Sequence, residues 1–336
     1  MKKIKFLFQR IKSMNYKAMF EAIDEVHKRS GKNKVLIFLD MVYCGFKYQA
    51  GYSDYLDFEF YNKNRKIRAN YVTRGISNAY VKKMNYDKEM WKLIDDKNSF
   101  LKNFSHLHHR DWLDLSVHNE DDLKAFIEKH DKFIVKPIDG ICGKGIEVYN
   151  SDEIASVENL YQILKENGQW VVEEYITQHK ALSKLYPHSV NTIRIVTLKN
   201  SEGVHIPFAG IRMGNGKQID NLNNGGIAAK IDVDTGVICS NGAAKYGQRM
   251  TVHPMTNVQF KGYEIPHFEQ AKAAVIKAAE DIEGLNYLAW DVAILPDGVT
   301  IIEANPFPGH DIIQLPGYSE DLDTGMKDVF DKIIYE

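Results

Sequence analysis

Cysteine is scarce in this 336-residue chain, which contains only Cys44, Cys142 and Cys239. The three lie far apart and form no CxxC pair, so neither a disulfide framework nor a thiolate zinc site is indicated. An excess of charge of one sign is also missing, because 43 Lys and Arg stand against 45 Asp and Glu. Such a balance gives no bulk field that would attract nucleic acid or an anionic bilayer. We therefore expect a cytoplasmic protein that does not bind nucleic acid.

Long apolar runs are absent too, and with them the patterns of a signal peptide and of a membrane span. The first residues, 1–14, are basic and contain apolar residues at helical spacing, namely Ile4, Leu7, Phe8 and Ile11. This pattern predicts a basic amphipathic helix. Such a helix either makes weak contact with an anionic surface at the inner face of the membrane or packs on the protein's own core.

Changes of pattern along the chain predict three regions and an α+β fold. Residues 1–86 are rich in aromatic side chains and contain no chemical motif, so we expect an accessory or docking region. Residues 87–176 alternate helical and strand patterns and predict a small α+β subdomain. Residues 177–336 predict a larger, mainly antiparallel sheet with packed helices. Nothing in the sequence indicates the oligomeric state.

Two β-rich runs around a Pro-Asp-Gly turn predict a hairpin in residues 287–305, YLAWDVAILPDGVTIIEAN. If Leu295 faces Val299 across a three-residue loop, the numbers of any two opposed residues in the hairpin add up to the same total. Asp291 then lies directly opposite Glu303.

The opposed carboxylates of Asp291 and Glu303 would repel each other at a Cβ separation of ~5 Å. A hard divalent cation such as Mg²⁺ would compensate, with the carbonyl of Asn305, on the same face, as a further oxygen ligand. The alternative is that one carboxylate points to solvent or meets an arginine.

A glycine-rich loop follows Lys136, which ends the apolar strand FIVKP, and leads into a second strand. Glycines allow backbone N–H groups to turn inward and hold an anion, so the loop is a candidate phosphate-binding flap. Its candidate residues are Asp139, Gly140, Gly143, Lys144 and Gly145. The alternative is a flexible hairpin with solvated lysines.

A third candidate is the strand WVVEEYI, which ends in Glu173, Glu174, Tyr175 and Ile176. Its acids could accept hydrogen bonds from an adenine amine or from ribose hydroxyls, and the backbone of the last two residues offers a further donor and acceptor. The alternative is an edge strand with solvated acids.

Two arginines, Arg194 and Arg212, lie within strands of otherwise apolar or small residues. Such arginines require anionic partners. They could neutralise phosphates or a bound carboxylate. The alternative for each is a structural ion pair with a neighbouring acid.

VKP with a glycine loop, an apolar strand with EEYI, and a D…E-x-N hairpin occur here in one order. This ordered set resembles the ATP-grasp superfamily of carboxylate–amine ligases over about residues 96–314. The segments SVNTIRIVT and IEANPFPG look most like the sugar-transfer-associated ATP-grasp group, which is linked to surface-polysaccharide assembly. The resemblance implies two α+β subdomains that grip ATP, preceded here by an N-terminal accessory region.

The resemblance also implies roles for the candidate residues. Lys97, Lys136 and the loop 139–145 would bind phosphates, and residues 173–176 would form the adenine-binding hinge. Asp291, Glu303 and Asn305 would hold two Mg²⁺ ions. Arg194 and Arg212, helped by residues 221–226, would bind the transferred phosphoryl group and the substrate carboxylate.

The chain departs from the family pattern at two positions. Ala289 stands where many ligases have an arginine, so oxyanion stabilisation would fall to Arg194 or Arg212. The usual ribose-binding acid is missing, and His179 or Glu174 would replace it.

The implied reaction joins a small-molecule or glycan carboxylate to an amine through an acyl phosphate, with release of ADP and phosphate. Two alternatives stay open at this point. One is a kinase on the same scaffold that phosphorylates a sugar or glycan hydroxyl, and the other is a nucleotide-bound, non-catalytic partner of a polysaccharide assembly complex.

Overall fold

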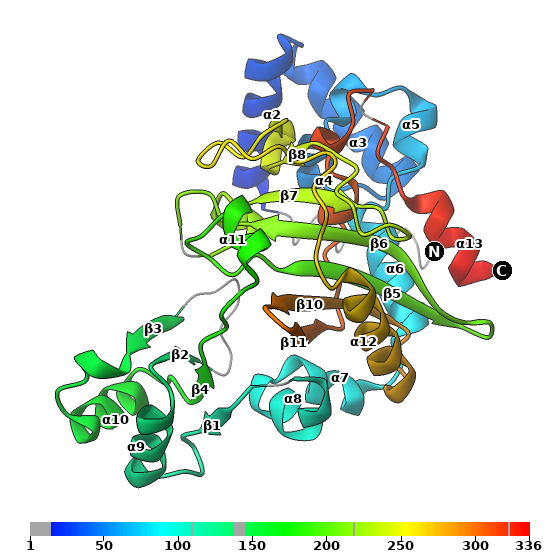
Figure 1. Ribbon diagram of the computed structural model, residues 1–336. Coiled ribbons are helices and arrows are strands. Elements are labelled where there is room, and N and C mark those ends of the chain that lie inside the picture. Colours follow the sequence, from blue (N-terminus) through cyan, green and yellow to red (C-terminus); the bar gives the residue numbers. More distant parts are fainter. Residues whose placement is uncertain (1–14, 109, 138–144, 218, 322) are drawn as a thin grey trace.

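The computed structural model describes residues 15–108, 110–137, 145–217, 219–321 and 323–336. These residues form a helical N-terminal unit, a small four-stranded sheet with two helices, and a large seven-stranded sheet with helices on both faces (Figure 1). The predicted α+β class with antiparallel sheets is confirmed. The predicted helix and membrane contact of residues 1–14 lie outside the described residues.

The N-terminal unit has its own core. It contains the helices α2 (Tyr16–Ser30), α3 (Lys34–Tyr48), α4 (Tyr52–Asp57) and α5 (Arg65–Ala69). The side chains of Asn15 and Asn33 cap α2 and α3 by accepting backbone N–H bonds. Gly31, with φ of 67°, ends α2 in the left-handed region. Aromatic rings fill the interior between these helices, from Tyr48, Tyr55, Phe58, Phe60, Tyr61 and Tyr71.

The small sheet has the strand order β1-β4-β2-β3 and is antiparallel throughout. Its elements are β1 (Trp112–Asp114), α9 (Glu120–Lys129), β2 (Lys132–Lys136), β3 (Glu147–Asn150), α10 (Val157–Glu166) and β4 (Val171–Glu174). On β2, Phe133 and Val135 are buried in the core with α9 and α10. Because side chains alternate along a strand, Ile134 and Lys136 point to the opposite face, away from the helices.

The large sheet has the order β11-β10-β5-β6-β7-β8-β9. Its strands are β5 (Ile193–Asn200), β6 (Gly203–Met213), β7 (Ile227–Ile231), β8 (Gly242–Ala243), β9 (Arg249–Met250), β10 (Tyr287–Leu295) and β11 (Gly298–Asn305). Every residue of β10 from Tyr287 to Ile294 is buried. A strand in this position is covered on both faces, which explains its near-continuous apolar sequence.

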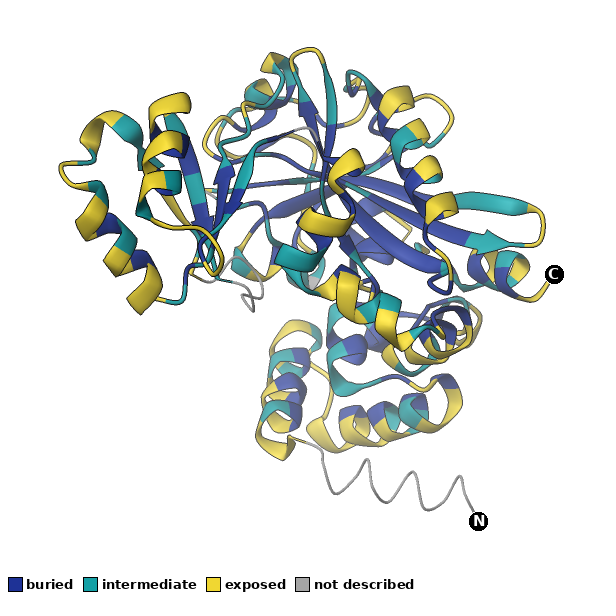
Figure 2. Cartoon of the chain, turned by 90° about the horizontal axis from the view of Figure 1, so that it is seen from below, coloured by how far each residue is buried: buried dark blue, intermediate teal, exposed yellow. Residues whose placement is uncertain are grey.

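Helices cover both faces of the large sheet (Figure 2). One face packs with α7 (Lys88–Asp95), α8 (Lys97–Asn103) and α12 (Phe268–Asp281). The other face packs with α6 (Arg74–Met84) and α13 (Lys327–Tyr335). Trp290 lies in the first of these cores and its neighbour Ala289 in the second, so Asp291 points to the α6 side.

The predicted division at residues 86 and 176 stays a prediction. Within it, α7 and α8 contribute Ile94 and Phe100 to the core of the large sheet rather than to the core of the small sheet. The short helix α11 (Lys180–Leu185) follows the small sheet and also packs on the large one, through Leu182 and Leu185.

No helix in the described ranges is both long enough and apolar enough to cross a bilayer.

Candidate active site

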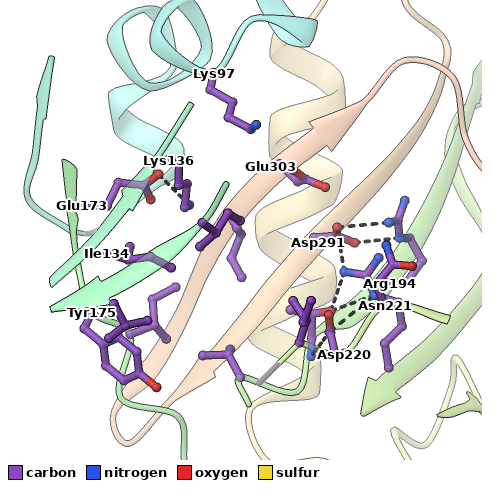
Figure 3. A pocket seen from close by; sticks show the side chains of 18 of the residues that line it. Lys97, Ile134, Lys136, Glu173, Tyr175, Arg194, Asp220, Asn221, Asp291 and Glu303 are labelled. Carbon is purple, nitrogen blue, oxygen red and sulfur yellow. Dashed lines mark hydrogen bonds and ion pairs between the residues drawn. The ribbon is translucent and has the colours of Figure 1, made fainter. Parts of the chain in front are cut away.

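A cavity of about 1130 Å³ lies between the small sheet and the large sheet. Figure 3 shows side chains from both sheets pointing into it. The predicted site residues that line it are Lys97, Lys136, Glu173, Glu174, Tyr175, Ile176, Arg194, Arg212, Asp291, Glu303 and Asn305. The fold therefore brings together residues that are up to 208 positions apart, from Lys97 to Asn305.

Six further candidates are placed differently or lie outside the description. Asp139, Gly140, Gly143 and Lys144 belong to the segment that is not described, and their phosphate-binding role stays a prediction. Gly145 is described: it has φ of 76°, and its carbonyl accepts a hydrogen bond from Gln169. His179 caps α11, where its Nδ1 accepts from the N–H of Ala181, and it is not a lining residue of the described cavity.

The carboxylate hairpin pairs Asp291 with Glu303, as predicted. The predicted pairing of Leu295 with Val299 is wrong, because Leu295 pairs with Gly298 and the loop has two residues instead of three. At Asp291 and Val292 a β-bulge shifts the register by one residue, with Ile302 of β11 as the extra residue, and this restores the predicted pairing of the carboxylates.

Asp291 is 2% exposed and meets both predicted arginines. Its Oδ1 lies 2.6 Å from Nε of Arg194, and its Oδ2 lies 2.9 Å from Nη2 of Arg212. Arg194 reaches Asp291 from the neighbouring strand β5, directly opposite it in the ladder. The ion pairs that the sequence left as alternatives for the arginines are therefore present, and they lie at the cavity wall.

Arg212 is held by a second set of partners that the sequence did not reveal. Its guanidinium donates two hydrogen bonds to Oγ1 of Thr192, at 3.0 and 2.8 Å, and its Nε lies 3.5 Å from Oδ2 of Asp220. Burial disfavours the charged guanidinium, but Asp220 and Asp291 outweigh this effect and raise the pKa of Arg212. The arginine is thus fixed as a buried cation that faces the cavity.

Glu303 is a buried carboxyl group beside a second carboxylate, that of Asp291. Burial and the neighbouring charge of Asp291 raise the pKa of Glu303, and the arginines only partly offset this shift. A buried carboxyl group that is costly to ionise therefore lies beside Asp291.

The donors at this position fit a hard divalent cation. Two facing carboxylates, Asp291 and Glu303, and the amide of Asn305 offer the oxygen ligands that Mg²⁺ takes, and the raised pKa of Glu303 marks a place where added positive charge is favourable.

On the small sheet, Glu173 is the centre of a buried ion-pair network. Its Oε1 accepts from Nζ of Lys136 at 2.6 Å, and its Oε2 accepts from Nε of Arg110 at 2.6 Å. Burial alone would raise the pKa of Glu173, but the two cations outweigh it and lower the pKa to about 2. Glu173 is thus committed to these cations, while Lys136 lines the cavity beside it.

Arg110 was not a candidate from the sequence. It precedes β1 and also donates to the carbonyl of Ile301 at 2.9 Å and of Ile302 at 3.3 Å, both on β11. A glutamate in an apolar strand signals that a cation must be near, but no local pattern says which one. Arg110 therefore joins the small sheet to the strand that carries Glu303.

The other end of the cavity is less polar. Ile134 and Tyr175 lie there (Figure 3), and the ammonium of Lys132 lies 4.2 Å from the centre of the Tyr175 ring. Lys97 extends from the start of α8 toward the space between the two sheets (Figure 3), and its Nζ lies 3.4 Å from the carbonyl of Pro137. Apolar side chains at this end, with Lys132 and Lys97 nearby, are the arrangement that a planar base attached to phosphates requires.

Comparison with known proteins gives the following findings. No curated protein matches the chain. Among solved structures, it is similar to a D-alanine–D-alanine ligase from Helicobacter pylori, with 16% identity, 73% of this chain and 63% of that chain covered, and a TM-score of 0.43. It is also similar to D-cycloserine synthetase DcsG, with 12% identity, 72% and 71% covered, and a TM-score of 0.41.

A third similar structure is that of the ATP-grasp ligase PsnB, with 12% identity and a TM-score of 0.40. The match covers 67% of this chain but only 56% of the PsnB chain. The family model described as "Sugar-transfer associated ATP-grasp" matches residues 76–327, which is most of the chain. This match confirms the resemblance and the fold that the ordered motifs predict. The chain belongs to the sugar-transfer associated ATP-grasp family.

Proposed function

We propose that this protein is an ATP- and Mg²⁺-dependent carboxylate–amine ligase that works through an acyl phosphate and releases ADP and phosphate. The observation that carries the proposal is the convergence of Arg194 and Arg212 on Asp291, opposite Glu303, at the wall of a cavity between two sheets. A site with fixed cations and facing carboxylates suits a reaction in which negative charge moves between phosphate and carboxylate.

When bound, ATP supplies the phosphoryl group and Mg²⁺ neutralises its charge. Asp291, Glu303 and Asn305 are the residues that would hold two such ions. Lys97 and Lys136 would neutralise the remaining phosphate charge at the other side of the cavity. Lys136 is well suited to this because Glu173 fixes its ammonium in place.

The buried arginines would orient the substrate carboxylate. Arg212 presents a guanidinium that Thr192 and Asp220 hold in one orientation, so it offers preorganised positive charge. Ile134, Tyr175 and Ile176 would contact the base and exclude water from this end of the cavity.

The proposed setting is surface-polysaccharide assembly, in which a glycan or precursor would supply the carboxylate or the amine. This part follows from the name of the family. The proposed location is the inner face of the membrane, reached through weak contact of the basic residues 1–14.

The test is release of ADP and phosphate from ATP and Mg²⁺ by the purified chain, with uronic acids and amino acids supplied singly and in pairs. The proposal requires phosphate release only when a carboxylate and an amine are both present. ADP without free phosphate, together with a phosphorylated glycan, would assign the protein as a kinase instead.

Variants at the hairpin connect this activity to the site. Asp291→Asn and Glu303→Gln should each lower turnover by about 10²-fold or more, because each removes charge that the facing pair provides. Asp297→Asn is the matched control, since Asp297 is exposed at the turn of the same hairpin. Equal activity in all three variants would contradict the assignment.

A further inference from the structure

Helix α3 has two apolar faces, of which only one is covered. Its buried face contributes Ile37, Met41, Cys44 and Tyr48 to the core of the N-terminal unit. The opposite face carries a row at helical spacing that is 39–64% exposed, made of Val35, Leu39, Val42 and Phe46. A helix that is apolar all round normally lies inside a protein or a membrane, so the exposed row requires an explanation.

The exposure is concentrated in this unit. Eight of the eighteen large apolar side chains that are exposed in the described part of the chain lie on α2 and α3. Single exposed apolar residues are ordinary on any surface, but a continuous row is typical of an interaction site. The one acid of α3, Asp40, does not interrupt the row, because it is paired with Arg68 at 2.8 Å.

The sequence of α2, α3 and the residues before them is net positive. Residues 1–48 contain eleven Lys and Arg and four Asp and Glu, whereas the whole chain has a net charge of −2. Five of these cations lie in residues 1–14, which contain no acid and directly precede α2 in the sequence. Positive charge beside an apolar face complements an anionic lipid surface. A second copy docked on this face would instead bring two positive units together.

We infer that the exposed face of α3, formed by Val35, Leu36, Leu39, Val42 and Phe46, docks on an anionic phospholipid bilayer. Its apolar side chains enter the boundary between headgroups and acyl chains, and the basic residues nearby contact the headgroups. This surface is distinct from residues 1–14, whose five cations precede it in the sequence. Neither the proposed reaction nor its site is required for this docking.

Flotation of the full-length protein with vesicles tests the inference. One set of vesicles contains phosphatidylcholine alone, and the other contains equal parts of phosphatidylcholine and phosphatidylglycerol. We expect binding to the anionic vesicles, weaker binding to the neutral ones, and a decrease as salt is added. Absence of binding to the anionic vesicles would overturn the inference.

Paired variants locate the surface. Leu39→Glu with Phe46→Glu should lower the fraction bound by about tenfold or more. The control is Val117→Glu with Met255→Glu, since these residues are 76% and 55% exposed elsewhere on the chain. Equal binding by both double variants would refute the assignment. If the wild type is instead a dimer that the first double variant converts to a monomer, the face is a contact between copies and the inference is wrong.

A reporter at the surface keeps the test independent of the stability of the charged variants. Phe46→Trp should show a blue shift of its added fluorescence on anionic vesicles, because its ring would leave water. Met255→Trp should show none. The same spectrum for Phe46→Trp with and without vesicles would count against insertion of α3.

Discussion

Replacing Glu173 with glutamine tests the buried ion-pair network of the small sheet. The side chain of Glu173 is 3% exposed and accepts from Lys136 and Arg110, both at 2.6 Å. Glu173→Gln preserves the shape of the side chain and removes its charge. Two buried cations then lose their common anion, which is the costly way to break a buried ion pair.

The size of the effect follows from the pKa. Burial opposes the ionised form, but Arg110 and Lys136 lower the pKa of Glu173 from 4.5 to about 2. At 1.36 kcal/mol per unit, ionised Glu173 contributes about 3 kcal/mol to the free energy of unfolding near neutral pH. Because the pKa of the folded state is the lower one, this contribution is complete above about pH 5 and is lost as the pH falls toward 2.

Urea unfolding of wild type and variant, followed by tryptophan fluorescence, measures the difference as a function of pH. Trp112 and Trp170 both lie in the small α+β unit and report on its unfolding. We expect the variant to be less stable by about 3 kcal/mol at pH 7 and by a little under half of that at pH 3. Glu128→Gln, on the exposed surface of α9, should match the wild type at both pH values. A difference that stays constant from pH 7 to pH 3 would refute the reasoning, since the effect would then not come from ionisation.

Three further predictions concern the cavity and the backbone. Arg212→Lys should lower ADP release by about 10²-fold, because one ammonium cannot replace a guanidinium that contacts Thr192 and Asp291 together; unchanged release in the ADP assay would contradict this. Chelation of divalent cations should abolish ADP release, and added Mg²⁺ should restore it in the same assay. Gly284→Ala should lower the free energy of unfolding by about 2–4 kcal/mol, because the residue has φ of 77° and the new Cβ would lie 2.4 Å from Cβ of Asp87. The control Gly262→Ala, with φ of 87° and open space around it, should cost only about 1 kcal/mol. Thermal unfolding of both variants measures the difference.

The carboxylate hairpin shows how far local sequence patterns can predict a site. The pairing of Asp291 with Glu303 is correct, although the prediction started from a wrong pair at the loop. The turn closes with two residues, which shifts the register by one, and the bulge beside Asp291 shifts it back. Turn residues and alternation predict a hairpin, but they do not reveal a bulge, because the extra residue, Ile302 on β11, is as apolar as the residues before it.

The buried cations show where such patterns stop. Arg194 and Arg212 were found because an arginine within an apolar strand requires a partner, and the structure supplies Asp291 as that partner. Arg110 was missed because it lies before its strand, and its partner Glu173 is 63 positions away. Lone residues outside regular elements gain their environment only from tertiary packing. For the same reason, the packing of α7 and α8 on the large sheet could not be derived from their amphipathic pattern alone.

One chain of contacts links the two sides of the proposed site. Lys136 binds Glu173, Glu173 binds Arg110, and Arg110 binds the carbonyls of Ile301 and Ile302. The next residue on β11 is Glu303, whose carboxylate faces Asp291 across the hairpin. A lysine of the small sheet and a carboxylate of the large sheet are therefore aligned through a single buried arginine. Because both sheets contribute to the cavity, we expect this bridge to help set the distance between its two walls. We therefore propose Arg110 as a positioning residue, even though it is not a lining residue of the described cavity.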